Sequence, residues 1–154
     1  MSDISALYRD LKPDLEQVSG PLLEFAQQQV RKRGAFLPFG ATLNRSGEVA
    51  LQAGSSGEEV ESAGDVLPIL HAGLRATAAR GDVAAVAVCE WVKITPEGSG
   101  QTDAVKVLVE HERGLTIAFH VPCRRRMLGG WQFGDVLAKA VEPEVRPWHR
   151  GDAA

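Results

Sequence analysis

Cysteine and aromatic residues are scarce in this chain. Among its 154 residues there are two cysteines, and Phe, Trp and Tyr together make up 6%. A chain near this length buries roughly 68–70% of its unfolded surface when it folds, so it needs no disulfide or structural metal to be stable. We place Cys89 and Cys123 on strands that are not neighbours, which predicts two free thiols and suits a reducing compartment.

Long apolar runs are also missing. No stretch approaches the ~18 residues of a membrane span, and residues 1–10 lack the basic and apolar regions of a secretory signal. We therefore expect a cytoplasmic protein that does not bind membranes. The formal net charge of −3 gives no electrostatic support to general binding of nucleic acid.

The short motifs that accompany common chemistries do not occur. The sequence contains no Cys-x-x-Cys, no His-Glu-x-x-His, no Gly-x-Ser-x-Gly, no Gly-x-Gly-x-x-Gly opening a helix and no calcium-binding loop. We therefore expect neither a metal nor a cofactor. The absence of these motifs does not exclude a site assembled from residues that are distant in the sequence. Such a site must be sought through the predicted strand register.

The stretch from Asp103 to Val121, DAVKVLVEHERGLTIAFHV, predicts a β-hairpin whose register can be counted. A three-residue loop ending at Gly114 gives glycine the left-handed position that it occupies at low cost. His111 then lies opposite Leu115, the odd-numbered residues form an apolar face, and the even-numbered residues form a mixed face. A two-residue loop would scramble both faces, so the hydrophobic pattern selects the longer loop.

A long strand from Val83 to Ile94 precedes this hairpin. If the connecting loop joins the two strands without a bulge, Ile94 pairs with Asp103 and the even-numbered residues of the long strand join the apolar face. Glu90 would then point into that face near Val107, where an unpaired carboxylate is costly. A bulge that turns Glu90 outward is the alternative.

Three helical segments are predicted. Apolar residues recur at helical spacing in residues 1–18, but Pro13 must interrupt or restart a helix there, so we expect a separate helical arm. Ser19-Gly20-Pro21 is a start signal for a second helix, which ends in Arg31-Lys32-Arg33 and a closing glycine. Asp65 to Arg80 has an acidic start and a leucine stripe, both typical of a third helix.

The remaining segments predict strands and a tail. Residues 35–44 and 49–53 flank a turn of hairpin composition. Residues 131–140 fit either a short helix or a strand, and residues 142–154, which include two prolines, predict a poorly ordered tail. Residues 1–154 are therefore expected to form a single globular domain of the α+β class with a five-stranded antiparallel sheet.

The element order α-β-β-α-β-β-β over residues 21–140 resembles the profilin-like domains, including the roadblock-type light chains. That resemblance implies a strand order of 2-1-5-4-3 with helices on both faces. It implies no function, because no diagnostic motif accompanies the topology. The stretches GAFLPFGATLNRSGEV and TDAVKVLVEHERGLTIAFHVP also look like bacterial domains of unassigned function.

The predicted register brings one candidate catalytic cluster together on the mixed face. Lys106 should neighbour Trp91 and His120, with Glu110 nearby, and a lysine in such surroundings can act as a base or as an imine-forming amine. Glu90 is a further candidate carboxylate. The structural alternative is an amphipathic strand surface under a helix, on which Lys106 lays its stem over Trp91.

A basic segment gives a second candidate site. Arg124, Arg125 and Arg126, together with Trp131, are suited to recognise a carboxylate or a phosphate, whereas the structural alternative is a solvated loop. We favour a non-enzymatic interaction protein, a homodimer or a subunit of a small assembly, that associates through a sheet edge or a helix. An anion-binding protein using these arginines is the second hypothesis, and an enzyme using the Lys106 cluster is the third.

Overall fold

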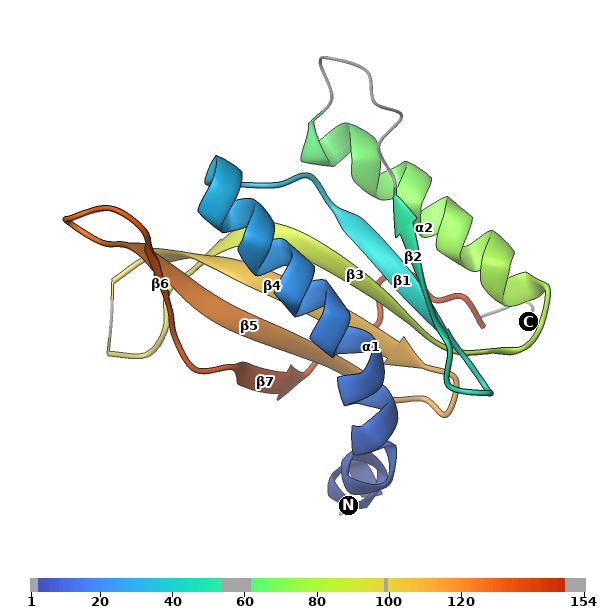
Figure 1. Ribbon diagram of the computed structural model, residues 1–154. Helices are drawn as coiled ribbons and strands as arrows, with labels where there is room; N and C mark the ends of the chain where they lie inside the picture. Colours follow the sequence, from blue (N-terminus) through green and yellow to red (C-terminus); the bar gives the residue numbers. More distant parts are fainter. Residues whose placement is uncertain (1–2, 54–61, 99, 149–154) are drawn as a thin grey trace.

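The described part of the chain consists of two helices and seven strands (Figure 1). The structure is a computed structural model that describes residues 3–53, 62–98 and 100–148. In chain order the elements are α1 (Asp3–Arg33), β1 (Phe39–Asn44), β2 (Val49–Ala53), α2 (Ala63–Ala79), β3 (Val83–Ile94), β4 (Thr102–His111), β5 (Thr116–Arg125), β6 (Trp131–Phe133) and β7 (Leu137–Ala140).

All seven strands belong to one sheet with the order β2-β1-β3-β4-β5-β6, and β7 pairs with β5 beside β6. The α+β class and the antiparallel pairing are confirmed, whereas five strands in the order 2-1-5-4-3 is wrong. The outer side of β5 is occupied by β6 and β7, which both form from residues 131–140. β1 therefore pairs with β3, from Phe39 opposite Cys89 to Leu43 opposite Ala85.

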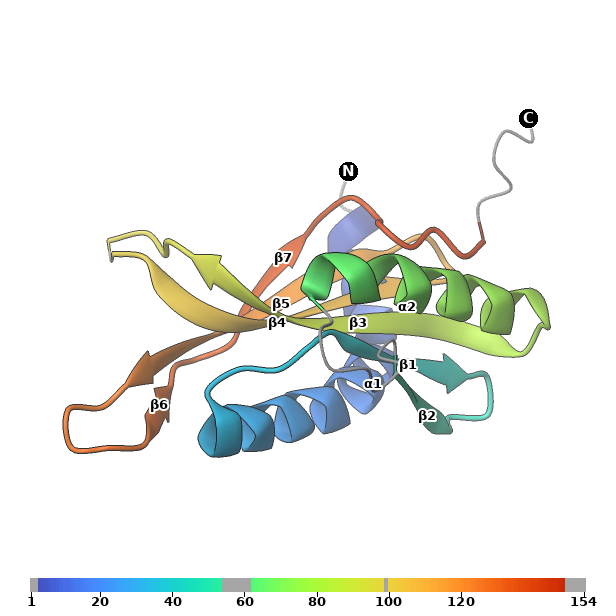
Figure 2. The same cartoon turned by 90° about the horizontal axis from the view of Figure 1, so that it is seen from above.

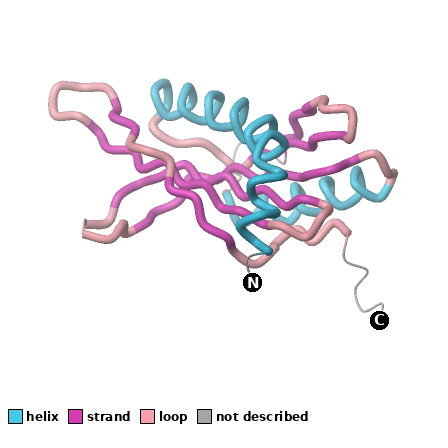
Figure 3. The backbone as a smooth tube through the Cα atoms, turned by 90° about the horizontal axis from the view of Figure 1, so that it is seen from below, coloured by secondary structure: helices cyan, strands magenta, loops and turns pink. Residues whose placement is uncertain are grey.

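The two helices cover opposite faces of the sheet. Figure 2 shows α1 on one side of the strands and α2 on the other, and Figure 3 shows the same separation from below. We call the two sides the α1 face and the α2 face. The α2 face also carries the C-terminal segment, residues 141–148, whose Val145 packs in the same cluster as Leu70 and Leu74 of α2.

The β4–β5 hairpin has the predicted register. Lys106 lies opposite His120 and Val107 lies opposite Phe119. The amide of His111 donates to the carbonyl of Leu115 at 2.8 Å, and Gly114 has φ +94°. The apolar face of this hairpin is confirmed, because its odd-numbered residues pack against α1.

The predicted register between β3 and β4 is wrong by one residue. Ile94 pairs with Thr102 rather than Asp103, so Glu90 lies opposite Lys106 on the α2 face and not opposite Val107. The alternative of a bulge is also wrong, since the β3–β4 ladder is continuous. Both faces of β3 are apolar along Val83–Val88, so its hydrophobic pattern does not distinguish one register from the other.

Helix α1 is continuous through Pro13 and Pro21, which corrects the prediction of a separate arm at residues 1–18. Its apolar stripe runs on past Pro13: Leu11, Leu15, Val18 and Leu22 are all buried. Tertiary packing therefore offsets the cost of interior prolines. The dark blue N-terminal part of α1 runs in a different direction from the rest of the helix (Figure 1), as expected for a proline-containing helix.

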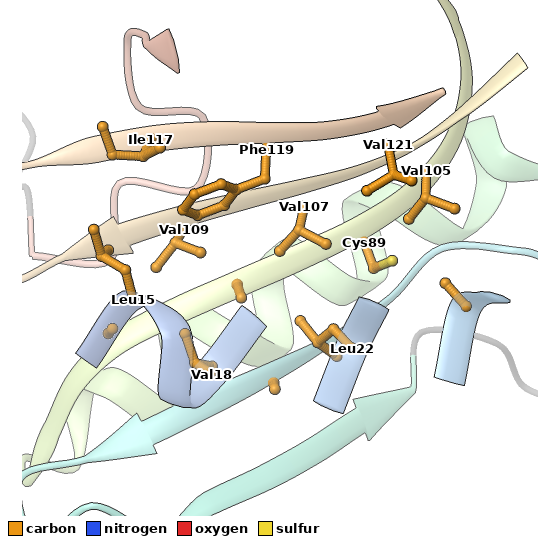
Figure 4. Packing of buried hydrophobic residues seen from close by; sticks show 14 of the residues in the cluster. Leu15, Val18, Leu22, Cys89, Val105, Val107, Val109, Ile117, Phe119 and Val121 are labelled. Carbon is orange, nitrogen blue, oxygen red and sulfur yellow. The ribbon is translucent and has the colours of Figure 1, made fainter. Parts of the chain in front are cut away.

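The main hydrophobic core lies between α1 and the sheet. Figure 4 shows Leu15, Val18 and Leu22 of α1 facing the side chains of β3, β4 and β5. Small residues of β3 (Ala85, Ala87) lie in the same cluster, so the long helix can approach the sheet closely.

Helix α2 starts and ends with strong local signals. Ser62 forms a capping box with Asp65, and Gly81 beyond the last turn has φ +88°. A Cβ on Gly40 of β1 would lie 2.5 Å from the carbonyl oxygen of Ala87. Glycine is therefore needed where β1 lies under α2 and beside β3.

The C-terminal residues that the structure describes differ from the predicted tail. Val145 is 1% exposed, and Arg75 of α2 donates to its carbonyl at 3.2 Å. Residues 142–148 therefore pack on the α2 face, whereas residues 149–154 of the predicted tail lie outside the described residues.

Candidate functional site

The structure separates the cluster that the sequence predicts around Lys106. Trp91 pairs with Val105 and packs on the α1 face, so its indole lies on the opposite side of the sheet from Lys106. Lys106 keeps His120 as a cross-strand neighbour and has Glu90 on its other side. Its Nζ lies 3.8 Å from a carboxylate oxygen of Glu90 and 3.3 Å from one of Glu144. This is a compensated charge cluster, not a free nucleophilic amine.

Burial changes the titration of the two strand residues beside Lys106. Desolvation raises the pKa of Glu90, and Lys106 opposes that shift only in part. Desolvation lowers the pKa of His120, and the nearby charges of Lys106 and Lys139 lower it further. Relative to a side chain in water, both environments therefore shift the protonation equilibrium toward the neutral form.

Glu110 holds the C-terminal segment against the sheet. Its side chain accepts three backbone N–H bonds, from Glu144 at 2.7 Å, Val145 at 2.6 Å and Arg146 at 2.8 Å. Glu110 is 2% exposed, so these bonds replace its hydration. We call this arrangement the Glu110 latch. The sequence predicted the side of the strand on which Glu110 lies but not its partners, because residues 144–146 carry no recognisable turn motif.

A contact between a buried histidine, His111, and the partly exposed Asp14 was not predicted from the sequence. Nε2 of His111 lies 2.8 Å from a carboxylate oxygen of Asp14, and Nδ1 accepts the backbone N–H of Arg113 at 3.2 Å. Both ring nitrogens are therefore engaged, which leaves neither available as a general base. Only the contact between α1 and the hairpin joins these residues, so no local motif identifies them.

The other titratable candidates have structural surroundings. The thiols of Cys89 and Cys123 are free and buried, and burial raises both pKa values, that of Cys123 to about 11. Such thiols stay protonated at neutral pH and are poor nucleophiles. Nε2 of His71 is buried and has no hydrogen-bond partner among the described residues.

The two basic segments of the sequence meet at one end of the molecule. A Cβ on Gly34, which follows the last turn of α1, would lie 3.4 Å from a guanidinium nitrogen of Arg125. Figure 2 shows this end of α1 beside the β5–β6 hairpin. We call the region the basic end, and it comprises Arg31, Lys32, Arg124, Arg125, Arg126, Trp131 and Phe133.

Aromatic rings support two of these arginines. The guanidinium carbon of Arg125 lies 4.9 Å from the ring centroid of Trp131, and that of Arg31 lies 4.9 Å from the ring centroid of Phe133. Trp131 in turn packs edge-on against Trp91 with centroids 5.9 Å apart. Stacking on rings restricts the arginine side chains and leaves their N–H groups available to an acceptor.

The cations of the basic end have no carboxylate partner within the described ranges. All five cationic residues are exposed. The ion pairs found in residues 3–53, 62–98 and 100–148 use other cations: Lys12, Arg45, Lys93, Lys106 and His111. The carboxyl end of α1 favours nearby cations, but only by about 0.3–1 kcal/mol each.

Two hollows of similar size lie elsewhere on the surface. One, of about 470 Å³, lies between the start of α1, the β4–β5 loop and the C-terminal segment. The other, of about 480 Å³, is lined by Phe25, Phe36, Leu37 and Phe39, with Arg33 at its rim. Lys106 lines neither hollow, so neither supports the hypothesis of a lysine-based enzyme.

Other functional classes receive no support from the described residues. These residues contain no group of three or more His, Cys, Asp or Glu side chains that could hold a metal ion. None of the helices in this part of the chain is long and apolar enough to cross a membrane.

No protein-family model, curated protein or solved structure matches the chain.

Proposed function

We propose that this protein is an interaction domain that binds an acidic segment of a protein partner at the basic end. The observation that carries the proposal is the meeting of two basic segments, about ninety residues apart in the sequence, with no carboxylate partner for their side chains among the described residues. Exposed cations that the fold leaves unpaired are available to an anionic ligand.

The aromatic rings favour a protein segment over a long polyanion. Arg125 on Trp131 and Arg31 on Phe133 present guanidinium edges, which match carboxylates in a bidentate manner. The rings beside them can contact apolar side chains that flank the carboxylates. The net charge of −3 acts against long polyanions, because they would also approach the acidic remainder of the protein.

Calorimetric titration with a short oligoglutamate peptide tests this proposal. We expect binding that weakens between about 50 and about 300 mM NaCl, since exposed charges are screened by salt. Arg125→Ala should weaken it about tenfold, which corresponds to ~1.4 kcal/mol. Arg113→Ala is the matched control, because Arg113 is also exposed but lies in the β4–β5 loop.

Three outcomes would contradict the proposal. The first is no binding of the peptide at low salt, and the second is equal weakening by Arg113→Ala and Arg125→Ala. The third is a clear preference for pyrophosphate or for a single-stranded oligonucleotide over the peptide. That result would show that the basic end binds a different class of ligand.

A further inference from the structure

The outer edge of β2 is open. β2 is the last strand on its side of the sheet, and within the described residues it pairs only with β1 (Figure 2). The amide of Asn44 donates to the carbonyl of Glu48 at 2.9 Å. Because antiparallel ladders alternate, the backbone groups of Ala50 and Gln52 point toward β1, and those of Val49, Leu51 and Ala53 point outward.

Among residues 3–53, 62–98 and 100–148, nothing gives this edge the features that usually prevent pairing. The strand reads VALQA, without charge or proline, and its ladder with β1 runs from Phe39–Ala53 to Leu43–Val49 without a bulge. Natural edge strands are commonly protected by lysine, proline, a bulge or a covering element. An unprotected row of N–H and C=O groups accepts another strand.

Exposed apolar side chains border the edge on both faces. Leu51 is 59% exposed on the α1 face, beside the hollow lined by Phe25 and Leu37. Ile69 of α2 is 58% exposed. It lies on the same side of the helix as Gly73 and Thr77, the residues that approach Gln52 of β2. The neutral edge is therefore the centre of a wider apolar margin.

We propose that a second copy of this chain pairs with β2, antiparallel, about a two-fold axis through Leu51. Leu51 is the middle residue of Val49–Ala53, so the axis places it opposite Leu51 of the partner subunit. Val49 then lies opposite Ala53 of the partner subunit. These outward-facing residues form hydrogen-bonded pairs, each of which exchanges both of its N–H···O bonds. The two sheets become one continuous sheet.

The charge distribution selects a second copy over an acidic partner. A two-fold interface must be complementary to itself, and a neutral strand meets no like charge when it pairs with its own copy. An acidic segment would find no opposite charge on the strand itself, because Val49–Ala53 is neutral. The dimer therefore goes beyond the proposed function and does not depend on it.

Light scattering and a cysteine cross-link test the pairing. We expect a dimer at tens of micromolar, and we expect Leu51→Lys to convert it to a monomer, because a lysine at the centre of the pair meets its own copy. Leu137→Lys is the matched control: Leu137 is also exposed, at 45%, but lies on β7 at the other side of the sheet. Circular dichroism confirms that both variants are folded.

Leu51→Cys gives a readout that does not depend on losing the dimer. Directly opposed residues in a hydrogen-bonded pair have Cα atoms about 5.5 Å apart, which permits a disulfide. Mild oxidation should therefore link Leu51→Cys to itself between subunits, whereas Leu137→Cys should stay monomeric under denaturing conditions.

The proposal is overturned by a monomeric wild-type protein, by a dimer that survives Leu51→Lys, or by a Leu51→Cys variant that does not cross-link. Arg125→Ala should leave the dimer intact, and Leu51→Lys should leave oligoglutamate binding intact. The two proposals therefore fail separately.

Discussion

Two charged regions of the molecule differ in how their charges are compensated. On the α2 face, Glu110 accepts three backbone N–H bonds, and Lys106 lies between the carboxylates of Glu90 and Glu144. At the basic end, five exposed cations have no carboxylate partner among the described residues. We therefore expect the first region to stabilise the fold and the second to contribute little to it, and this difference is the reason for proposing the second as the binding surface.

This difference shows why the kind of residue alone is a poor guide to function. The α2-face cluster contains Lys, Glu and His, the residues of acid–base chemistry, yet Lys106 and Glu110 there are engaged by partners within the protein. The basic end contains no acid–base pair, and within the part of the chain that the structure describes its cations have no carboxylate partner. The state of compensation, not the chemical type, separates structural charges from binding charges.

Removing the Glu110 latch should have the largest effect on stability. Glu110→Ala leaves the N–H groups of residues 144–146 without their acceptor, and we expect a loss of about 3 kcal/mol in the free energy of unfolding. Urea unfolding followed by circular dichroism measures it. Glu142→Ala, exposed on the same segment, should change that free energy by less than about 0.5 kcal/mol. Similar losses in both variants would remove the distinction between latched and solvated carboxylates.

The titration of His120 should produce a smaller effect that depends on pH. Burial, with Lys106 and Lys139, lowers its pKa below 6.5 in the folded protein. The unfolded chain therefore binds the proton more readily, so stability falls as the pH drops from about 7 through the folded-state pKa. His120→Gln should flatten the stability profile in that window. A profile that is equally steep in this variant would show that other groups produce the dependence.

Much of the fold follows from local patterns in the sequence, but the pairing of β1 with β3 does not. The loop ending at Gly114 fixes the β4–β5 register, and Ser62, Asp65 and Gly81 mark the ends of α2. The β3 register was predicted one residue out, because Val83–Val88 is apolar on both faces. The resemblance to profilin-like domains gave the wrong strand order, since it left no place for β6 and β7 beside β5.

The candidate sites depend on contacts between segments distant in the sequence. Lys106 and His120 were correctly predicted as neighbours because one hairpin contains both. Trp91 was predicted on the wrong face, since its position depended on the β3 register. The sequence did not predict that Arg31 and Lys32 lie near Arg124–Arg126. Their position depends on the full length of α1, which the prediction divided at its prolines. The binding site predicted at Arg124, Arg125, Arg126 and Trp131 stays a prediction. The structure adds that the end of α1 lies beside these residues.

The central claim is tested most directly by urea unfolding with and without saturating oligoglutamate. The measurement compares the wild-type protein with a variant that carries Arg124→Ala, Arg125→Ala and Arg126→Ala. In the wild-type protein the peptide should raise the free energy of unfolding, because it binds only the folded state. The variant should keep the ligand-free stability to within about 1 kcal/mol, as exposed substitutions usually do, and should lose most of the increase that the peptide produces. A large fall in ligand-free stability with an unchanged peptide effect would contradict the account, since these arginines would then support the fold and bind nothing.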